Sequence, residues 1–276
     1  MDEEKLEKLK QELPDIQNLK DERQKSIKKV GIRQLKTPIR IKQPNGNVIS
    51  TVGDWSVYTS LNEEVKGASM SRYSEIIHDV VKDSVSVDII SNMLKTLKEK
   101  LKSNDSYVKI RFTYFTKAKA PVSEREGYLH HDCILEGKSV NGNNKIYLTV
   151  TVGYTSNCPC SKEISDYGAH GQRGFATITV ELNPNNILLI EDIVNIVENN
   201  SCSPLRPILK RPDERYVTMK AYDNAKFVED IGRDIAVSLD EQMNSKIFDY
   251  VVVINHEENI HLHNAVAIIS AGKLLH

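Results

Sequence analysis

The sequence predicts an α+β protein built from two similarly ordered halves. Apolar and polar residues alternate over several segments, as they do in half-buried strands. Other segments place apolar residues three and four positions apart, as in amphipathic helices. The order strands, helices, strands then occurs once in each half of the chain. This repeated order indicates an internal structural duplication, although no residue-level repeat accompanies it.

The first half begins with a charged segment. Residues 1–29 alternate Lys and Glu and meet Pro14, which suggests a solvated helical arm and a linker. A hairpin is expected over 30–60, because Pro-Asn-Gly-Asn at 44–47 separates two extended segments. One broken helix or two consecutive helices fit 71–101. Strands are expected at 107–115, 128–135 and 145–154.

The second half follows the same order. A polar, glycine-bearing loop is expected over 155–174, and the segments after it are assigned by their periodicity. Strands are expected at 176–182, 248–254 and 265–269, and helices at 189–197 and 224–243. We therefore place a first module at 30–142 and a second at 143–276.

Composition narrows the functional classes. The 276 residues are 39% hydrophobic, which is enough for a sizeable core. The 37 basic and 38 acidic residues nearly cancel, so no overall field draws the chain to nucleic acid or an anionic membrane. The N-terminus does not resemble a secretory signal, and no stretch approaches the roughly 20 apolar residues that span a bilayer. A cytoplasmic protein with reduced thiols is expected, since four cysteines are too few for a disulfide scaffold.

The most informative segment is 158–174, Cys-Pro-Cys-Ser-Lys-Glu-Ile-Ser-Asp-Tyr-Gly-Ala-His-Gly-Gln-Arg-Gly. A thiolate and a neutral imidazole are natural ligands for a divalent transition metal, and the loop between Cys158 and His170 is long enough to bring them to one centre. A disulfide within Cys-Pro-Cys would be strained. Small buried thiols beside a surface His remain the alternative from spacing alone.

A second signal is Glu-Asn-Ile-His-Leu-His at 258–263. In an extended strand, His261 and His263 would point to the same face and could enter one pocket. Two ordinary surface histidines near a strand end are the alternative.

Two further segments carry charge. Lys210, Arg211 and Arg215 surround Glu214, which could bind phosphate oxygens while presenting a carboxylate to a metal; a solvated charge run is the alternative. Glu229 lies in Phe-Val-Glu-Asp at 227–230, between apolar neighbours. It could accept paired hydrogen bonds from a guanine-like edge, although most helical Glu residues face water.

Taken in order, these motifs resemble the type IB GTP cyclohydrolases. The match comprises Cys-Pro-Cys-Ser-Lys-Glu-Ile-Ser, His-Gly-Gln-Arg-Gly, Lys-Arg-Pro-Asp-Glu, Phe-Val-Glu-Asp and the terminal Glu-Asn-Ile-His-Leu-His-Asn-Ala, with Met70-Ser71-Arg72 as a further segment. Five ordered motifs are far more specific than any single one. Asn259 and Asn264 depart from the Ser and Asp of many relatives, and Ser69 stands where some carry His.

The resemblance implies a fold and an assembly. It implies two tunnelling-fold modules, with antiparallel sheets and helices on one face, that assemble into a barrel-like homotetramer with active sites at subunit boundaries. It also implies that Cys158, His170 and Glu214 hold the metal and that Glu229 anchors guanine. The residues implied at the reaction centre are Cys158, Cys160, Glu258, His261 and His263.

The activity implied is hydrolytic opening of the imidazole ring of GTP, with release of formate and formation of 7,8-dihydroneopterin 3'-triphosphate. One thiolate, one imidazole and one carboxylate suit Mn²⁺, Fe²⁺ or Zn²⁺. The candidates for binding the triphosphate are Lys162, Arg173, Lys210, Arg211 and Arg215. Three alternatives are an archaeal-type relative that yields the 2',3'-cyclic phosphate, a non-catalytic purine- or pterin-binding protein, and a structural zinc module.

Overall fold

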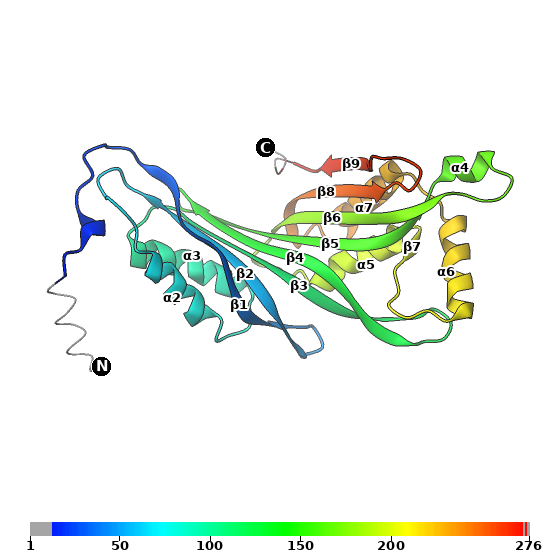
Figure 1. Ribbon diagram of the computed structural model, residues 1–276, viewed down its shortest axis with the longest axis horizontal. Coiled ribbons are helices and arrows are strands. Elements are labelled where there is room, and N and C mark those ends of the chain that lie inside the picture. The colour runs from blue at the N-terminus through cyan, green and yellow to red at the C-terminus, as the bar shows by residue number, and fades with distance from the viewer. Residues whose placement is uncertain (1–12, 273, 275–276) are drawn as a thin grey trace.

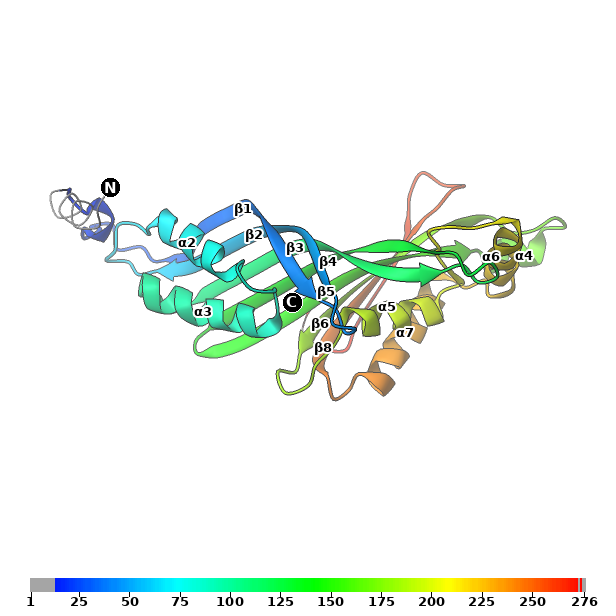
Figure 2. The same cartoon turned by 90° about the horizontal axis from the view of Figure 1, so that it is seen from below.

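A computed structural model describes residues 13–272 and 274. The part of the expected helical arm before residue 13 lies outside the described residues. The described chain forms one nine-stranded antiparallel sheet with the order β1-β2-β3-β4-β5-β6-β8-β9, and β7 pairs with β5. Figures 1 and 2 show an elongated, twisted sheet with its long helices gathered on one face. None of the described helices is long and apolar enough to span a membrane.

The first half confirms the expected hairpin and helix pair. The strands β1 (Ile27–Lys42) and β2 (Val48–Leu61) pair across the 44–47 turn. Two consecutive helices follow, α2 (Met70–Val80) and α3 (Val87–Leu101). Ser86 caps α3 by accepting a hydrogen bond from the Ile89 amide, and Lys102 ends it in the left-handed region at φ 51°. The half closes with β3 (Ser106–Lys119) and β4 (Glu126–Val140).

The second half repeats this order with insertions. Its elements are β5 (Asn143–Asn157), α4 (Pro159–Ile164), β6 (Gly171–Leu182), α5 (Ile190–Asn200), β7 (Ser203–Pro204), α6 (Arg211–Asp223), α7 (Val228–Gln242), β8 (Ile247–Glu257) and β9 (Ala265–Ser270). The division proposed at residue 142 falls in the turn between β4 and β5. Because these two strands pair along their length, the sheet runs through both halves, and the modules stay an interpretation of the sequence.

Three expectations for this half were wrong. The loop that was expected over 155–174 is shorter and comprises only residues 158–170. Asn157 pairs with Gly171, so β5 and β6 extend into both ends of the expected loop. The helix α6 was missed, since its charged residues show little apolar periodicity, although Pro212 suits its first turn. The helix expected from residue 224 begins at Val228, because Asp230 accepts a hydrogen bond from the Phe227 amide and sets the start.

One continuous core explains why the halves are joined. The inward side chains Trp55, Ile110, Val150, Ile178 and Val252 are fully buried and lie on strands from both halves. Burying each such side chain stabilises the fold by roughly 1.5–3 kcal/mol. The pairs α2/α3 and α5/α7 cover this apolar face, as Figure 2 shows.

A buried carboxylate ties α6 to the first half. Asp213 has no exposed surface, and it accepts hydrogen bonds from the amides of Val122, Ser123 and Lys210 and from the Ser123 hydroxyl. Burial alone would raise the pKa of this carboxyl, but these hydrogen bonds hold it well below its usual range. The tip of the β3–β4 hairpin is therefore attached to the N-terminal end of α6.

Candidate active site

A cavity of about 320 Å³ opens beside β6 and β8, where the start of α7 and the 158–170 loop meet them. The inward faces of the strands lose their apolar character here. Further along the same faces stand buried apolar residues such as Val152, Ile178 and Ile254, whereas Tyr154, Gln172 and His256 stand at this end. The titratable groups that line the cavity are Cys158, His170, Lys226, Glu229, His256, Glu258, His261 and His263.

Backbone hydrogen bonding brings Cys158 and His170 together. The Cys158 amide donates to the His170 carbonyl over 3.1 Å, which closes the 158–170 loop at its base. Ser161 strengthens the closure, because its hydroxyl accepts from the His170 amide and donates to the Cys158 carbonyl, each over 3.1 Å. The two residues are far apart along the loop but adjacent at the cavity.

Gln172 orients the His170 ring. The Gln172 Oε1 lies 2.9 Å from His170 Nδ1, and its Nε2 donates to Glu258 Oε1 over 3.4 Å. The Glu258 carboxylate is also 3.8 Å from His170 Nδ1. With Nδ1 donating to this polar pair, Nε2 is the ring nitrogen left to act as a ligand.

His256 forms a buried polar floor with two hydroxyls of β5. Its Nε2 lies 2.9 Å from the Tyr154 hydroxyl, and its Nδ1 lies 3.3 Å from Ser156 Oγ. Burial lowers the pKa of His256 to about 4, and the charge of Glu229 opposes this only in part. The imidazole is therefore neutral at pH 7, and both of its nitrogens are engaged.

Gly174 makes room for this floor. Tyr154, Gly174 and His256 face each other across β5, β6 and β8. A Cβ on Gly174 would lie 2.3 Å from Tyr154 Cε2, so the tyrosine ring occupies the space above the glycine.

Gly174→Ala is expected to lower the free energy of unfolding by about 1–3 kcal/mol, because the buried Tyr154 ring is held by His256 and cannot shift freely. Urea unfolding followed by circular dichroism measures the loss. Gly67→Ala is the control, since the nearest atom to its Cβ would be 3.8 Å away, in ordinary contact. Equal stability of the two variants would contradict the packing argument.

His261 and His263 reach the same side by a different route from the one expected. The segment 258–264 is a loop with bends and no strand pairing, so the extended-strand premise was wrong. The two rings nevertheless stack, with centroids 4.9 Å apart and planes 11° from parallel. Both are exposed and line the cavity, where they can exchange protons with a bound molecule.

Glu229 supplies a free carboxylate. It lies in the first turn of α7 and lines the cavity, and among the described residues no hydrogen bond or ion pair engages it. Such a group can accept two hydrogen bonds from a planar edge with adjacent donors.

The other predicted residues lie outside the lining. Glu214, Arg211 and Arg215 are exposed on α6, Lys210 precedes that helix, and Cys160 is exposed on α4. Arg173 is exposed beside a separate hollow near Leu205. Lys162 donates to the Tyr222 carbonyl over 2.7 Å, and its ammonium lies 4.4 Å from the centroid of the Tyr222 ring.

The geometry of α6 explains where Glu214 lies. The 158–170 loop contacts this helix at Tyr222 near its C-terminal end, whereas Glu214 is near the end tied to the β3–β4 hairpin. Eight residues of helix separate the two positions, or about 12 Å. Within the described residues, no three His, Cys, Asp or Glu side chains come together in a way that could hold a metal ion.

The donors that do converge suit a transition metal in part. Cys158 offers a thiol, and His170 offers Nε2 on a ring oriented by Gln172, the arrangement that metal-binding histidines adopt. The single chain thus brings together two of the three expected ligands.

Sequence reasoning did not single out five residues of this site. His256, Tyr154 and Ser156 build the floor, Gln172 orients His170, and Lys226 lines the wall. The four strand residues share one signal, a polar residue at an inward position at the end of an otherwise apolar strand, whereas Lys226 lies in the segment between α6 and α7 and carries no such signal. That signal could have been found by following the alternation of β5, β6 and β8 to their ends.

The fold and the cavity together define a class of protein. It is an α+β enzyme whose site combines a thiol, several imidazoles and a carboxylate without an ion-pair partner among the described residues, groups that suit acid–base and hydrolytic chemistry. A model of the family described as type I GTP cyclohydrolase folE2 matches residues 13–267. GTP cyclohydrolase FolE2 of Methylobacillus flagellatus is 39% identical over 261 residues, covering 95% of this chain and 96% of the relative. That of Thermosipho africanus is 39% identical over 262 residues, covering 94% and 98%. The chain belongs to the type I GTP cyclohydrolase folE2 family.

Solved structures agree on the fold. Uricase from Arthrobacter globiformis superposes with a TM-score of 0.51 at 7% identity, over 89% of this chain and 93% of that one. A Bacillus sp. TB-90 urate oxidase mutant gives 0.53 at 8%, over 90% and 100%. At such identities the likeness concerns the fold alone, and it confirms the expected tunnelling fold.

Proposed function

We propose that this protein hydrolyses the imidazole ring of GTP, releases formate and forms 7,8-dihydroneopterin 3'-triphosphate. The observation that carries the proposal is the cavity itself. It gathers an unpaired carboxylate for a purine edge, a thiol beside an oriented imidazole, and two stacked histidines. Membership of the folE2 family supports GTP as the substrate.

Glu229 would bind the guanine end. Its carboxylate can accept hydrogen bonds from N1–H and the 2-amino group, the two adjacent donors of guanine. Adenine lacks this pair, so the same contact favours GTP over ATP. Held in this way, C8 would face the Cys158 and His170 side of the cavity. The reacting carbon and the attacking water would then be held in a fixed orientation, which lowers the entropic cost of the reaction.

Cys158, His170 and Glu214 are the proposed metal ligands, and Mn²⁺, Fe²⁺ and Zn²⁺ all suit them. When bound, the ion supplies a water of lowered pKa for attack at C8. His261 or His263 would donate a proton to N7 and later return protons as the ring opens. Glu258 would hold the Gln172 and His170 pair in place. Cys160 is exposed on α4 outside the lining of this cavity, so its proposed role at the reaction centre requires an assembly that brings the two together.

The triphosphate would extend beyond the cavity of one chain if it is bound by the proposed basic residues, because all of them lie outside the lining: Lys162, Arg173, Lys210, Arg211 and Arg215. This placement supports active sites completed at subunit boundaries. The sheet ends in β1 on one side and β9 on the other, so both outer edges can pair with another copy. We therefore propose a barrel-like homotetramer in the cytoplasm, serving folate synthesis or a modified transfer-RNA base.

The test is to incubate purified protein with GTP and Mn²⁺ and to measure formate and, after oxidation, a fluorescent pterin. Mass analysis separates the triphosphate product from a 2',3'-cyclic phosphate. Failure to release formate with Mn²⁺, Fe²⁺ and Zn²⁺ alike would overturn the proposal.

Gln172→Leu is expected to weaken metal binding by roughly 10–100-fold, because His170 loses the partner that orients its ring. Titration with Mn²⁺ followed by electron paramagnetic resonance measures the affinity without turnover. Gln242→Leu, at the far end of α7, is the matched control. Unchanged Mn²⁺ affinity in the Gln172 variant would show that Gln172 does not support metal binding through His170.

A further inference from the structure

Among the described residues, Glu229 has no ion-pair partner, although two cations lie close to it along the chain. Lys226 precedes it by three residues and lines the same cavity, and Arg233 follows it by one turn of α7. An ammonium on a flexible stem is a strong competitor for an open carboxylate. Other acceptors must therefore bind these two cations and keep them from pairing with Glu229.

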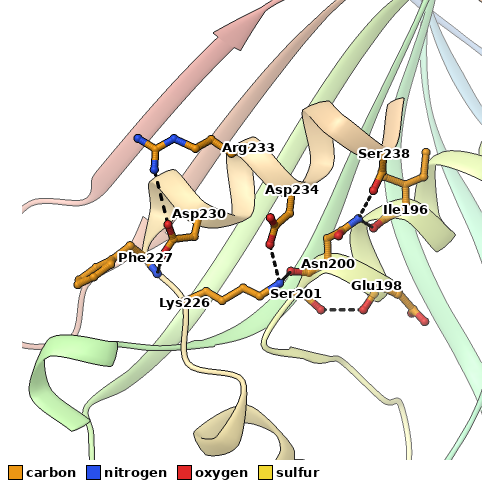
Figure 3. A network of polar contacts seen from close by, with 10 residues as sticks. All are labelled: Ile196, Glu198, Asn200, Ser201, Lys226, Phe227, Asp230, Arg233, Asp234 and Ser238. Atoms are coloured by element: carbon orange, nitrogen blue, oxygen red, sulfur yellow. Dashed lines mark hydrogen bonds and ion pairs between the residues drawn. The ribbon is translucent and has the colours of Figure 1, made fainter. Parts of the chain in front are cut away.

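Figure 3 shows what occupies Lys226. Its ammonium donates to Asp234 Oδ2 over 2.8 Å and to the Asn200 carbonyl over 2.9 Å. Asn200 ends α5, and its side chain donates to Ser238 Oγ on α7 over 2.9 Å. The lysine stem thus leads away from the cavity wall, and its charge lies between the Asn200 carbonyl at the end of α5 and Asp234 on α7.

Arg233, the other cation near Glu229 on α7, also has a partner. The Arg233 guanidinium lies 3.6 Å from Asp230, which in turn accepts from the Phe227 amide and so stays at the start of α7. His256 lines the same cavity as Glu229, but this imidazole is neutral at pH 7 and both of its nitrogens are engaged by Tyr154 and Ser156. Among the described residues, neither Arg233 nor His256 forms an ion pair or a hydrogen bond with the Glu229 carboxylate.

We propose that Asp234 is a positioning residue for substrate binding, which holds the Lys226 ammonium away from Glu229 so that the Glu229 carboxylate stays open to guanine. The inference rests on the proposed function, because it takes Glu229 as the guanine anchor. Without Asp234, the lysine stem can turn back into the cavity and pair with Glu229. Guanine then has to displace that ammonium before its own donors can bind.

The experiment compares steady-state kinetics with GTP for Asp234→Ala, Lys226→Met and the double variant. Asp234→Ala is expected to raise KM about threefold to fivefold with kcat unchanged, since a partly exposed ion pair must be broken on binding. In the double variant no ammonium is left to compete for Glu229, so its KM is expected to equal that of Lys226→Met alone. High salt is expected to shrink the Asp234→Ala defect, because salt screens the competing pair.

Matched controls exclude general effects of losing an ion pair. Lys246→Met removes the partner of Asp192, a 2.8 Å pair whose lysine is about as exposed as Lys226, and Asp79→Ala removes the partner of Lys82. Both pairs lie outside the cavity lining, so KM should not change. Thermal melting of all variants establishes that each is folded.

The outcomes separate the inference from the function it rests on. An unchanged KM in Asp234→Ala overturns the inference, and so does a Lys226→Met variant as defective as Asp234→Ala, because Lys226 would then itself support binding. Wild-type turnover of GTP and a raised KM in Glu229→Gln test the proposed function independently. If those two hold and the KM of the double variant stays above that of Lys226→Met, only the inference is lost.

Discussion

Cys158→Ala is expected to abolish both metal binding and turnover. The thiolate is the softest of the proposed ligands, and the Cys158–His170 pair is the part of the donor set that this chain itself assembles. Losing one of three ligands leaves too few donors to retain a transition metal at micromolar concentrations. Metal content by mass spectrometry and formate release measure the two effects separately.

Cys202→Ala is the control, since this thiol is fully buried in the core and does not line the cavity. It should keep its metal. Full metal occupancy in Cys158→Ala would remove Cys158 from the ligands. Glu214→Gln, measured in parallel, decides whether the exposed carboxylate on α6 completes the set, and undiminished metal content would exclude it.

Glu229→Ala is expected to raise KM for GTP by roughly 100-fold while metal content stays unchanged. The variant removes two charge-assisted hydrogen bonds to guanine, each worth about 1.5–3 kcal/mol, and the loss is set at the lower end because the carboxylate is exposed to water. Equilibrium binding of GTP to the protein, followed by calorimetry, reports the affinity without turnover.

Glu241→Ala provides the comparison, because it removes an exposed carboxylate from the other end of the same helix. Its KM should match the unaltered protein. Tight GTP binding by Glu229→Ala would end the anchoring role, whereas loss of both GTP and metal would mean that the start of α7 had collapsed.

Much of the fold could be predicted from local pattern. The hairpin around 44–47, the helix pair in 71–101 and the strands of both halves follow from periodicity, because one buried face imposes its repeat on the residues. The failures were at α6, where a charged helix carries a weak repeat, and at 155–174, where the ends of β5 and β6 are polar. Polar strand ends look like loops until the strand that pairs with them is known.

The site divides in the same way. The sequence by itself determined the chemistry, since ordered motifs supply the thiol, the imidazoles and the carboxylates whatever their positions in space. Only the tertiary structure decided which of them meet. It placed Cys158, His170 and Glu229 in one cavity, left Glu214 on an exposed helix face, and added Gln172, His256 and Lys226. The reason is that the neighbours of a side chain in this site come from strands and helices distant along the chain. A local sequence pattern does not show which distant segments lie next to each other in the fold.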